Sequence, residues 1–239
     1  LLSFADDIRL GFTGDVFLGN WAEAHIDTHG VGYPFDGVRD LFNDMDAVIV
    51  NLENPVTTHD TPYTEKEYLL KARPGISRGL AEANIQAVSL ANNHILDFGP
   101  QGLFDTMHDL EQAGVLYAGA GRNRAEANRP ATLTINDQSI ALLGYSATFP
   151  EEFWATDTSA GTAFPYEPDV IAALDAATAE HDIVIVSIHW GAELREHPKD
   201  YQVTLAHLCV DHGADLVVGH HPHIVNGIEL YNDTPILYS

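Results

Sequence analysis

Short apolar runs that stop abruptly at a possible metal ligand are the feature that most constrains how this chain can fold. The clearest case is the stretch DLVVGHHPHIVNGIE at residues 215–229, where the apolar run 216–218 ends in a glycine. Three histidines follow within four residues: His220, His221 and His223. A buried strand that presents imidazoles at its carboxyl end is how α/β proteins build sites. Pro222 lacks a backbone N–H and cannot continue a central strand, so the sequence predicts a rigid histidine loop at one edge of a sheet.

An apolar run followed by a possible metal ligand, here called a junction, occurs four more times along the chain. The apolar runs are predicted to be strands at residues 8–14, 47–50, 85–90 and 182–188. The ligand-type residues that follow them are, in order, Asp15, Glu53, Asn93 with His94, and His189. If these strands are largely parallel, their carboxyl ends lie at one edge of the sheet, where α/β sites are found. We therefore expect all five junctions to meet.

The fold class predicted from the order of elements is α/β, an α/β sandwich built on a mixed sheet and flanked by helices. Helical spacing or end signals predict helices at residues 34–45, 77–83, 100–113, 168–180 and 200–212. Hairpins are expected around Asn136-Asp137 and Asn232-Asp233, and residues 57–73 are expected to form a long loop. No repeat or linker divides the chain, so residues 1–239 are interpreted as one domain. The chain stops inside an apparent strand at residues 235–238, which suggests that the domain is truncated at its C-terminal end.

The composition excludes several classes of protein. The net charge is −24 and the chain holds only 11 lysines and arginines, so nucleic acid is not expected as a partner. Two interpretations of this charge stay open: a protein kept soluble in high salt, where self-repulsion is screened, or an ordinary acidic protein. One cysteine, Cys209, excludes an intramolecular disulfide and any multi-cysteine zinc site. No run of about 18 apolar residues predicts a membrane span, and no signal peptide is visible.

The residue types at the five junctions point to metal chemistry. Two carboxylates, an asparagine oxygen and three imidazoles suit Mn²⁺, Fe or Zn²⁺ better than Ca²⁺, which prefers mostly oxygen ligands. Six such groups exceed one tetrahedral site and would serve a pair of metals roughly 3.5–4 Å apart. Each residue alone has an ordinary explanation: Asp15 as a helix N-cap, Glu53 as a loop carboxylate, Asn93 as a turn residue and His189 as a hydrogen-bonded core histidine. The coincidence of all five junctions favours the metal site.

Five segments of the sequence resemble the motifs of one known family. The segments are GDVFLG at 14–19, NLE at 51–53, ANNHILDFG at 91–99, HWGAE at 189–193 and GHHPH at 219–223. They are similar to the motifs of the CapA-type poly-gamma-glutamate (capsule) synthesis family, which itself resembles the calcineurin-like metallophosphoesterase superfamily. The resemblance covers essentially the whole chain and implies a metallophosphoesterase-like sandwich of mixed β-sheets. It also implies an extracytoplasmic protein that is membrane-anchored at full length, although a cytoplasmic location stays open.

The resemblance also implies roles for individual residues. Asp15 and His223 would bind a first metal, Glu53 would bridge, and Asn93, His189 and His221 would bind a second. His94 would be the general acid or would stabilise the leaving oxygen, with Asp97 orienting it, while the role of His220 stays open. The family pattern of phosphoesterases has a histidine where this chain has Phe17, and an aspartate where it has Glu53. Both departures weaken the first metal site, so one or two divalent ions are expected.

The expected substrate is an anionic small molecule or a polyglutamate-type polymer. An acidic protein needs local positive charge to bind an anion, so Lys71, Arg73 and Arg195 are candidate substrate-binding residues, and Glu193 could bind an ammonium group. The leading hypothesis is a capsule or polyglutamate synthesis protein with a metal-dependent hydrolase site. The alternative is an accessory domain that binds polyglutamate or the polymer synthase complex and catalyses nothing.

Overall fold

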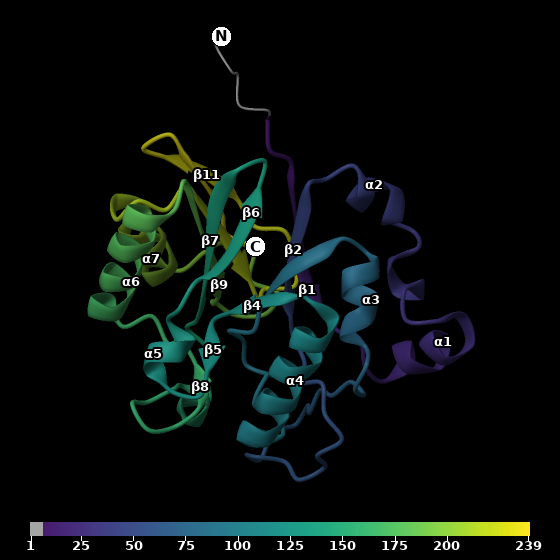
Figure 1. Ribbon diagram of the computed structural model, residues 1–239. Coiled ribbons are helices and arrows are strands. Elements are labelled where there is room, and N and C mark those ends of the chain that lie inside the picture. Colours follow the sequence, from purple (N-terminus) through teal and green to yellow (C-terminus); the bar gives the residue numbers. More distant parts are fainter. Residues whose placement is uncertain (1–6) are drawn as a thin grey trace.

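Two β-sheets face each other in the computed structural model, which describes residues 7–239 (Figure 1). The first sheet has the order β1-β2-β3-β4 and is parallel throughout. Its strands are β1 (Leu10–Val16), β2 (Ala47–Leu52), β3 (Ile85–Ser89) and β4 (Leu116–Ala118). All six residues of β2 are buried, as the continuous apolar run predicts for a strand covered on both faces.

The second sheet is mixed, with the order β11-β12-β10-β9-β7-β6. The central strands β12, β10, β9 and β7 are parallel, and antiparallel hairpins add the edge strands β11 and β6. Its strands are β6 (Ala131–Ile135), β7 (Gln138–Ser146), β9 (Ile183–His189), β10 (Leu216–His220), β11 (Ile228–Tyr231) and β12 (Thr234–Leu237). A separate two-stranded ribbon joins β5 (Ala120–Gly121) to β8 (Gly161–Thr162).

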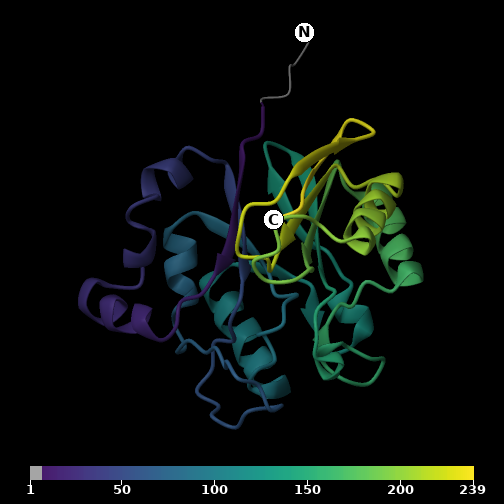
Figure 2. The same ribbon diagram turned by 180° about the vertical axis from the view of Figure 1, so that it is seen from behind.

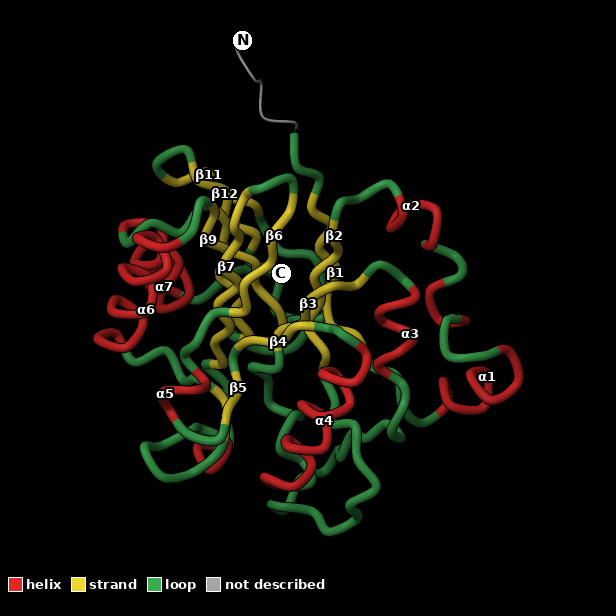
Figure 3. Tube along the Cα trace, in the orientation of Figure 1, coloured by secondary structure: helices red, strands yellow, loops and turns green. Residues whose placement is uncertain are grey.

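Helices cover the outer face of each sheet, so the molecule has four layers (Figures 1 and 2). The helices are α1 (Trp21–His29), α2 (Arg39–Asn43), α3 (Ser77–Glu82), α4 (Gly99–Ala113), α5 (Arg124–Ala127), α6 (Glu167–Glu180) and α7 (Asp200–Asp211), with short 3₁₀ turns η1 (Tyr33–Phe35) and η2 (Glu151–Phe153). Figure 3 shows the strands gathered in the centre with helices on both sides.

Three apolar clusters hold these layers together. One lies between the first sheet and the helices α1 to α4, and a second lies between the second sheet and α6 and α7. The third joins the two sheets directly, through Ala47, Ile49 and Ala87 on one side and Leu133, Ile140, Leu142 and Ile185 on the other. The predicted α/β sandwich of mixed sheets flanked by helices is therefore confirmed.

The two predicted hairpins are confirmed by their backbone. Asn136 and Asp137 have φ of 50° and 63°, and Asn232 and Asp233 have φ of 49° and 65°. Two consecutive positive φ values define the type I′ turn that suits a two-residue hairpin, and Asn and Asp tolerate this conformation. Residues 57–73 contain no helix or strand, apart from one isolated bridge from Val56 to Ala72, as the loop prediction expected.

The helix predictions near the N-terminus were partly wrong. Residues 34–45 form the short turn η1 and the five-residue helix α2 instead of one helix. Helix α1 was not predicted, because histidine, aspartate and threonine are weak helix formers and only Ala22 and Ile26 are buried in it. Among the helices of residues 7–239, none combines the length and the apolar character needed to cross a membrane.

Candidate metal centre

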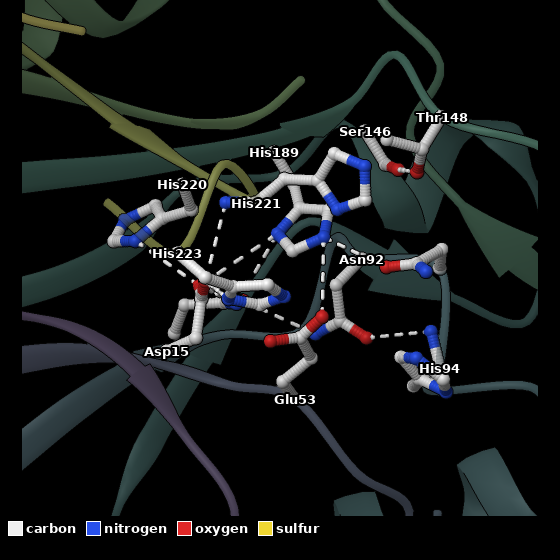
Figure 4. Close-up of polar contacts among 12 residues, drawn as sticks. Asp15, Glu53, Asn92, His94, Ser146, Thr148, His189, His220, His221 and His223 are labelled. Atoms are coloured by element: carbon white, nitrogen blue, oxygen red, sulfur yellow. Dashed lines mark hydrogen bonds and ion pairs between the residues drawn. The ribbon is translucent and has the colours of Figure 1, made fainter. Parts of the chain in front are cut away.

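The carboxyl ends of the parallel strands bring the five predicted junctions together. Asp15 is the penultimate residue of β1 and pairs with Asn51 of β2, while His189 ends β9 and pairs with His220 of β10. Glu53 comes directly after β2. Figure 4 shows Asp15, Glu53 and the imidazoles of His189, His221 and His223 turned toward one another, although Asp15 and His221 are 206 residues apart.

Asp15 is surrounded by groups that favour its charged form. The Nδ2 of Asn51 donates to Asp15 Oδ1 at 2.7 Å, and the backbone N–H of His221 donates to Asp15 Oδ2 at 3.2 Å. His223 Nδ1 lies 2.9 Å from Asp15 Oδ2, and His220 Nδ1 lies 3.5 Å from Asp15 Oδ1. Burial alone would raise the pKa of Asp15, but the contacts with His220 and His223 outweigh burial and hold this pKa well below its usual range.

His189 links the two carboxylates to the asparagine of the third junction. Its Nε2 lies 2.7 Å from Asn93 Oδ1 and 3.4 Å from Glu53 Oε1, and its Nδ1 lies 3.3 Å from Asn51 Nδ2. The side chain is 1% exposed. Burial lowers the pKa of His189 to about 3, so the ring is neutral at physiological pH, which is the form that binds metals.

The histidine loop has a constrained backbone. His221 and His223 have φ of 95° and 55°, values that residues with a Cβ seldom adopt. Such strained positions cluster at functional sites because surrounding contacts hold them. Here Pro222 O accepts from the backbone N–H of Leu194, and His221 N–H is bound to Asp15.

The donor set fits a divalent cation. Two groups of side chains each place their ligand atoms within 4.8 Å of one another: Glu53 with His221 and His223, and Asp15 with Glu53 and His189. His221 Nδ1 is buried and has no hydrogen-bond partner within residues 7–239. Burial, followed by the negative charge of Asp15, raises the pKa of Glu53 to about 7. Two carboxylates forced together in this way gain stability from a cation between them.

Glu53 belongs to both donor groups, which suits the bridging role expected of it. His223 lies beside His221 as well as beside Asp15. Which residues would bind which of two ions stays a prediction. A cavity of about 530 Å³ lies beside Asp15, His220 and His223.

His94 and Asp97 form a pair next to the ligand-type residues. His94 Nδ1 lies 2.7 Å from Asp97 Oδ2, with side-chain exposures of 12% and 0%. The backbone N–H of His94 donates to Asn92 Oδ1 at 3.1 Å, and Asn92 Nδ2 donates to Leu52 O at 2.8 Å. These bonds fix the loop after β3 to the end of β2, and Figure 4 shows His94 beside Asn92. Because Nδ1 contacts Asp97, the Nε2 of His94 is free of that carboxylate.

The four predicted substrate-binding residues lie in different surroundings. Lys71 is paired with Asp60 and lies 4.7 Å from the centre of the Phe98 ring, and Arg73 is paired with Asp27. In an acidic chain, basic side chains readily find nearby carboxylates, and the structure shows no contact of Lys71 or Arg73 with the centre among the residues it describes.

Glu193 and Arg195 lie in the loop that follows β9 and covers the histidine loop. The backbone N–H of Leu194, next to Glu193, donates to Pro222 O at 2.9 Å and ties this loop to the histidine loop. Arg195 Nε donates to His197 O at 3.0 Å, and Arg195 O accepts from Asn226. Their predicted contact with substrate stays a prediction.

The sequence did not predict a role in the site for three residues that contact its side chains: Asn51, Asn92 and Lys66. Asn51 uses both Nδ2 hydrogens, toward Asp15 and His189, and its Oδ1 accepts from Asn92. A signal existed, because residues i and i+2 of a strand lie on one face and Asn51 precedes Glu53 by two. No comparable signal exists for Lys66, which reaches Asp97 from the long segment 57–73.

Comparison with known proteins agrees with the motif resemblance. The family model described as "Bacterial capsule synthesis protein PGA_cap" matches residues 9–239. The PGA biosynthesis protein CapA of Bacillus subtilis (strain 168) is 33% identical over 241 residues, which cover 99% of this chain and 63% of that protein. A probable polyglutamine synthesis accessory protein of Mycobacterium tuberculosis is 34% identical over 204 residues, covering 81% of this chain and 54% of that protein. The chain thus spans less than two thirds of the length of these relatives.

Among solved structures, the crystal structure of the protein TT1561 of Thermus thermophilus is similar, with a TM-score of 0.51 and 11% sequence identity. The match covers 97% of this chain and 88% of that one. At this level of identity the similarity concerns the fold, and it extends over both sheets of the sandwich.

Proposed function

Because this chain belongs to the bacterial capsule synthesis protein family PGA_cap, we propose that it carries a metal-dependent hydrolase site serving capsule or poly-gamma-glutamate synthesis. The observation that carries the proposal is Glu53, a carboxylate shared by two groups of metal-ligand atoms at the end of β2. Asp15, Asn93, His189, His221 and His223 complete the proposed ligand set. The cofactor would be one or two divalent ions, Mn²⁺, Fe or Zn²⁺.

A divalent cation bound to this set would supply Lewis acidity and positive charge for hydrolysis. The residues next to the bound cation would transfer a proton and hold the ligands in place. His94 would give a proton from Nε2 to the leaving oxygen or nitrogen, while Asp97 Oδ2 accepts from Nδ1 and keeps the ring in that orientation. Asn51 would hold Asp15 and His189 in place by its two Nδ2 contacts.

The proposed substrate is a phosphate ester or an amide-linked anionic polymer of the polyglutamate type. The relatives bear names of PGA biosynthesis and polyglutamine synthesis, and a cationic centre recessed between two sheets would attract an anion to an otherwise acidic protein. We further propose an extracytoplasmic, membrane-anchored location with the polymer synthase complex as partner, because relatives bear names of capsule and PGA biosynthesis.

The alternative is an accessory domain that binds polymer or synthase and catalyses nothing. Phe17 favours this alternative, because it stands where the phosphoesterase pattern has a histidine and instead lines a hollow with Trp21 and Tyr33. The name of the Mycobacterium tuberculosis relative, an accessory protein, also agrees with it.

The decisive experiment combines metal analysis of the purified protein with hydrolysis assays. Aryl phosphates and γ-glutamyl amides would be tested with added Mn²⁺, using wild type and the His94→Asn variant. We expect bound metal and turnover that falls in His94→Asn by about 10²- to 10⁴-fold, the usual contribution of a general acid. Bound metal without turnover of either substrate class would favour the accessory alternative. Failure to bind metal under saturating conditions would refute the metal centre itself.

A further inference from the structure

The buried carboxylate of Asp97 anchors the segment 57–73 as well as His94. Asp97 Oδ2 accepts from the backbone N–H of Leu70 at 2.7 Å. The backbone carbonyl of Asp97 accepts from the backbone N–H of Tyr63 at 2.9 Å. The side chain is 0% exposed. One carboxylate therefore fixes both a long segment without helices or strands and the imidazole of the candidate general acid.

Lys66 completes this network from within the same segment. Its Nζ lies 2.5 Å from Asp97 Oδ1, 2.5 Å from the backbone oxygen of Asn93 and 3.1 Å from His94 Nδ1. The ring of Phe153 lies on another side, with its centre 5.4 Å from Nζ. An ammonium group has three donors, and two of them are used by Asp97 Oδ1 and the backbone oxygen of Asn93. The third lies beside His94 Nδ1, whose own proton is directed at Asp97 Oδ2.

The surroundings of Lys66 differ from those of an ordinary surface lysine. Its side chain is 17% exposed and that of its partner Asp97 is fully buried. Lys71 offers the contrast, because it lies in the same segment and pairs with Asp60, whose side chain is 85% exposed. A surface pair of that kind contributes little, whereas removing one partner of a buried pair leaves an uncompensated charge.

We propose that Lys66 is a positioning residue that couples the segment 57–73 to the candidate metal centre, by holding Asp97, the backbone of Asn93 and the ring of His94 in one arrangement. The catalytic consequence rests on the proposed hydrolase function, while the structural coupling does not. Lys66 acts through a metal ligand and through the candidate acid, in the way that outer partners orient ligands in other metal sites.

The test compares Lys66→Met, which keeps the apolar stem and removes the ammonium group, with Lys66→Arg, which keeps the charge. Arg78→Met serves as the matched control, because Arg78 forms an exposed i,i+4 pair with Glu82 on α3. Hydrogen exchange of the amides of residues 63–70 and the ¹⁵N–¹H spectrum of the His94 ring would be recorded for each variant. Circular dichroism would confirm folding, and Lys66→Arg keeps the test valid if Lys66→Met does not fold.

In Lys66→Met we expect exchange at residues 63–70 to accelerate at least about tenfold and the His94 signals to shift or broaden, with a smaller effect in Lys66→Arg and none in Arg78→Met. If hydrolysis is found, kcat of Lys66→Met should fall about 10- to 100-fold with little change in KM. Changes in exchange and in His94 without any activity in the wild type would support the coupling and refute the hydrolase function. Unchanged exchange and unchanged His94 signals in both Lys66 variants would overturn the proposal.

Discussion

At the scale of single residues, Glu53 concentrates the chemistry of the centre. It is buried, it stands in both donor groups, and burial beside Asp15 raises its pKa to about 7. A bound cation would strongly stabilise the charged form of a carboxylate in such a position, because the cation offsets the repulsion between Glu53 and Asp15.

We therefore predict that Glu53→Gln weakens Mn²⁺ binding on the order of 100-fold or more, since even outer partners of metal ligands contribute 10- to 100-fold. Isothermal titration calorimetry of wild type and variant measures this directly. Glu152→Gln is the matched control, because Glu152 is exposed on η2. Equal affinity in wild type and Glu53→Gln would contradict the shared-ligand role.

The single cysteine gives a second prediction at this scale. Burial raises the pKa of the Cys209 thiol from 9.0 to about 12. Below pH 9 the thiol is protonated in both states, whereas between pH 9 and 12 only the unfolded chain releases the proton, so the free energy of unfolding falls as the pH rises. We expect no reaction with a thiol reagent at pH 8 in the folded protein, full reaction in denaturant, and a shallower decline above pH 9 in Cys209→Ala. Rapid labelling of the folded protein would contradict the burial.

At the scale of elements, the end of β10 is set by a close approach of backbones. A Cβ on Gly219 would lie 2.2 Å from Tyr238 O and 2.6 Å from Trp190 Nε1, and that indole donates to Tyr238 O at 3.0 Å. Glycine is therefore required at this position of β10, where the strand approaches Trp190 and Tyr238 immediately before the histidine loop.

We predict that Gly219→Ala lowers the free energy of unfolding by about 1–3 kcal/mol or more, because backbone atoms must move to admit the methyl group. Gly37→Ala is the control, since a Cβ there meets no atom within 4 Å, and its effect should stay within about 0.5 kcal/mol. Urea unfolding measures both. A Gly219→Ala midpoint equal to that of Gly37→Ala would show that this approach is not constraining.

At the scale of the whole molecule, the net charge of −24 sets the response to salt. Unpaired carboxylates on the surface repel one another, and screening shortens the range of this repulsion from about 10 Å at 0.1 M salt to about 3 Å at 1 M. Within residues 7–239, several of the lysine and arginine ion pairs that salt would weaken are exposed, such as Arg78 with Glu82. Because 35 acidic residues face only 11 lysines and arginines, the loss of repulsion dominates.

The urea midpoint should therefore rise between 0.1 and 1 M KCl, and NaCl should act equally. The measurement is a series of equilibrium unfolding curves at fixed pH. A midpoint that falls or stays constant would favour the interpretation of an ordinary acidic protein whose charges are already compensated.

The sequence alone was sufficient to predict much of the fold and the ligand-type residues of the candidate metal centre. Period, turn residues and apolar runs are local properties, so β2, β9, α4 and the two Asn-Asp hairpins follow from them. The ligand-type residues at the strand ends were likewise visible, because their chemistry and their place after an apolar run are read from neighbouring positions.

Only the tertiary structure decided how these residues meet. The contact of Asp15 with the backbone of His221 joins positions 206 apart, and the engagement of Asp97 by Lys66 depends on the path of a segment without periodicity. It also showed that Lys71 and Arg73 have other partners. Residue type and spacing determine which groups a chain can offer, whereas the distances between them arise from the packing of two sheets, a property of the whole chain.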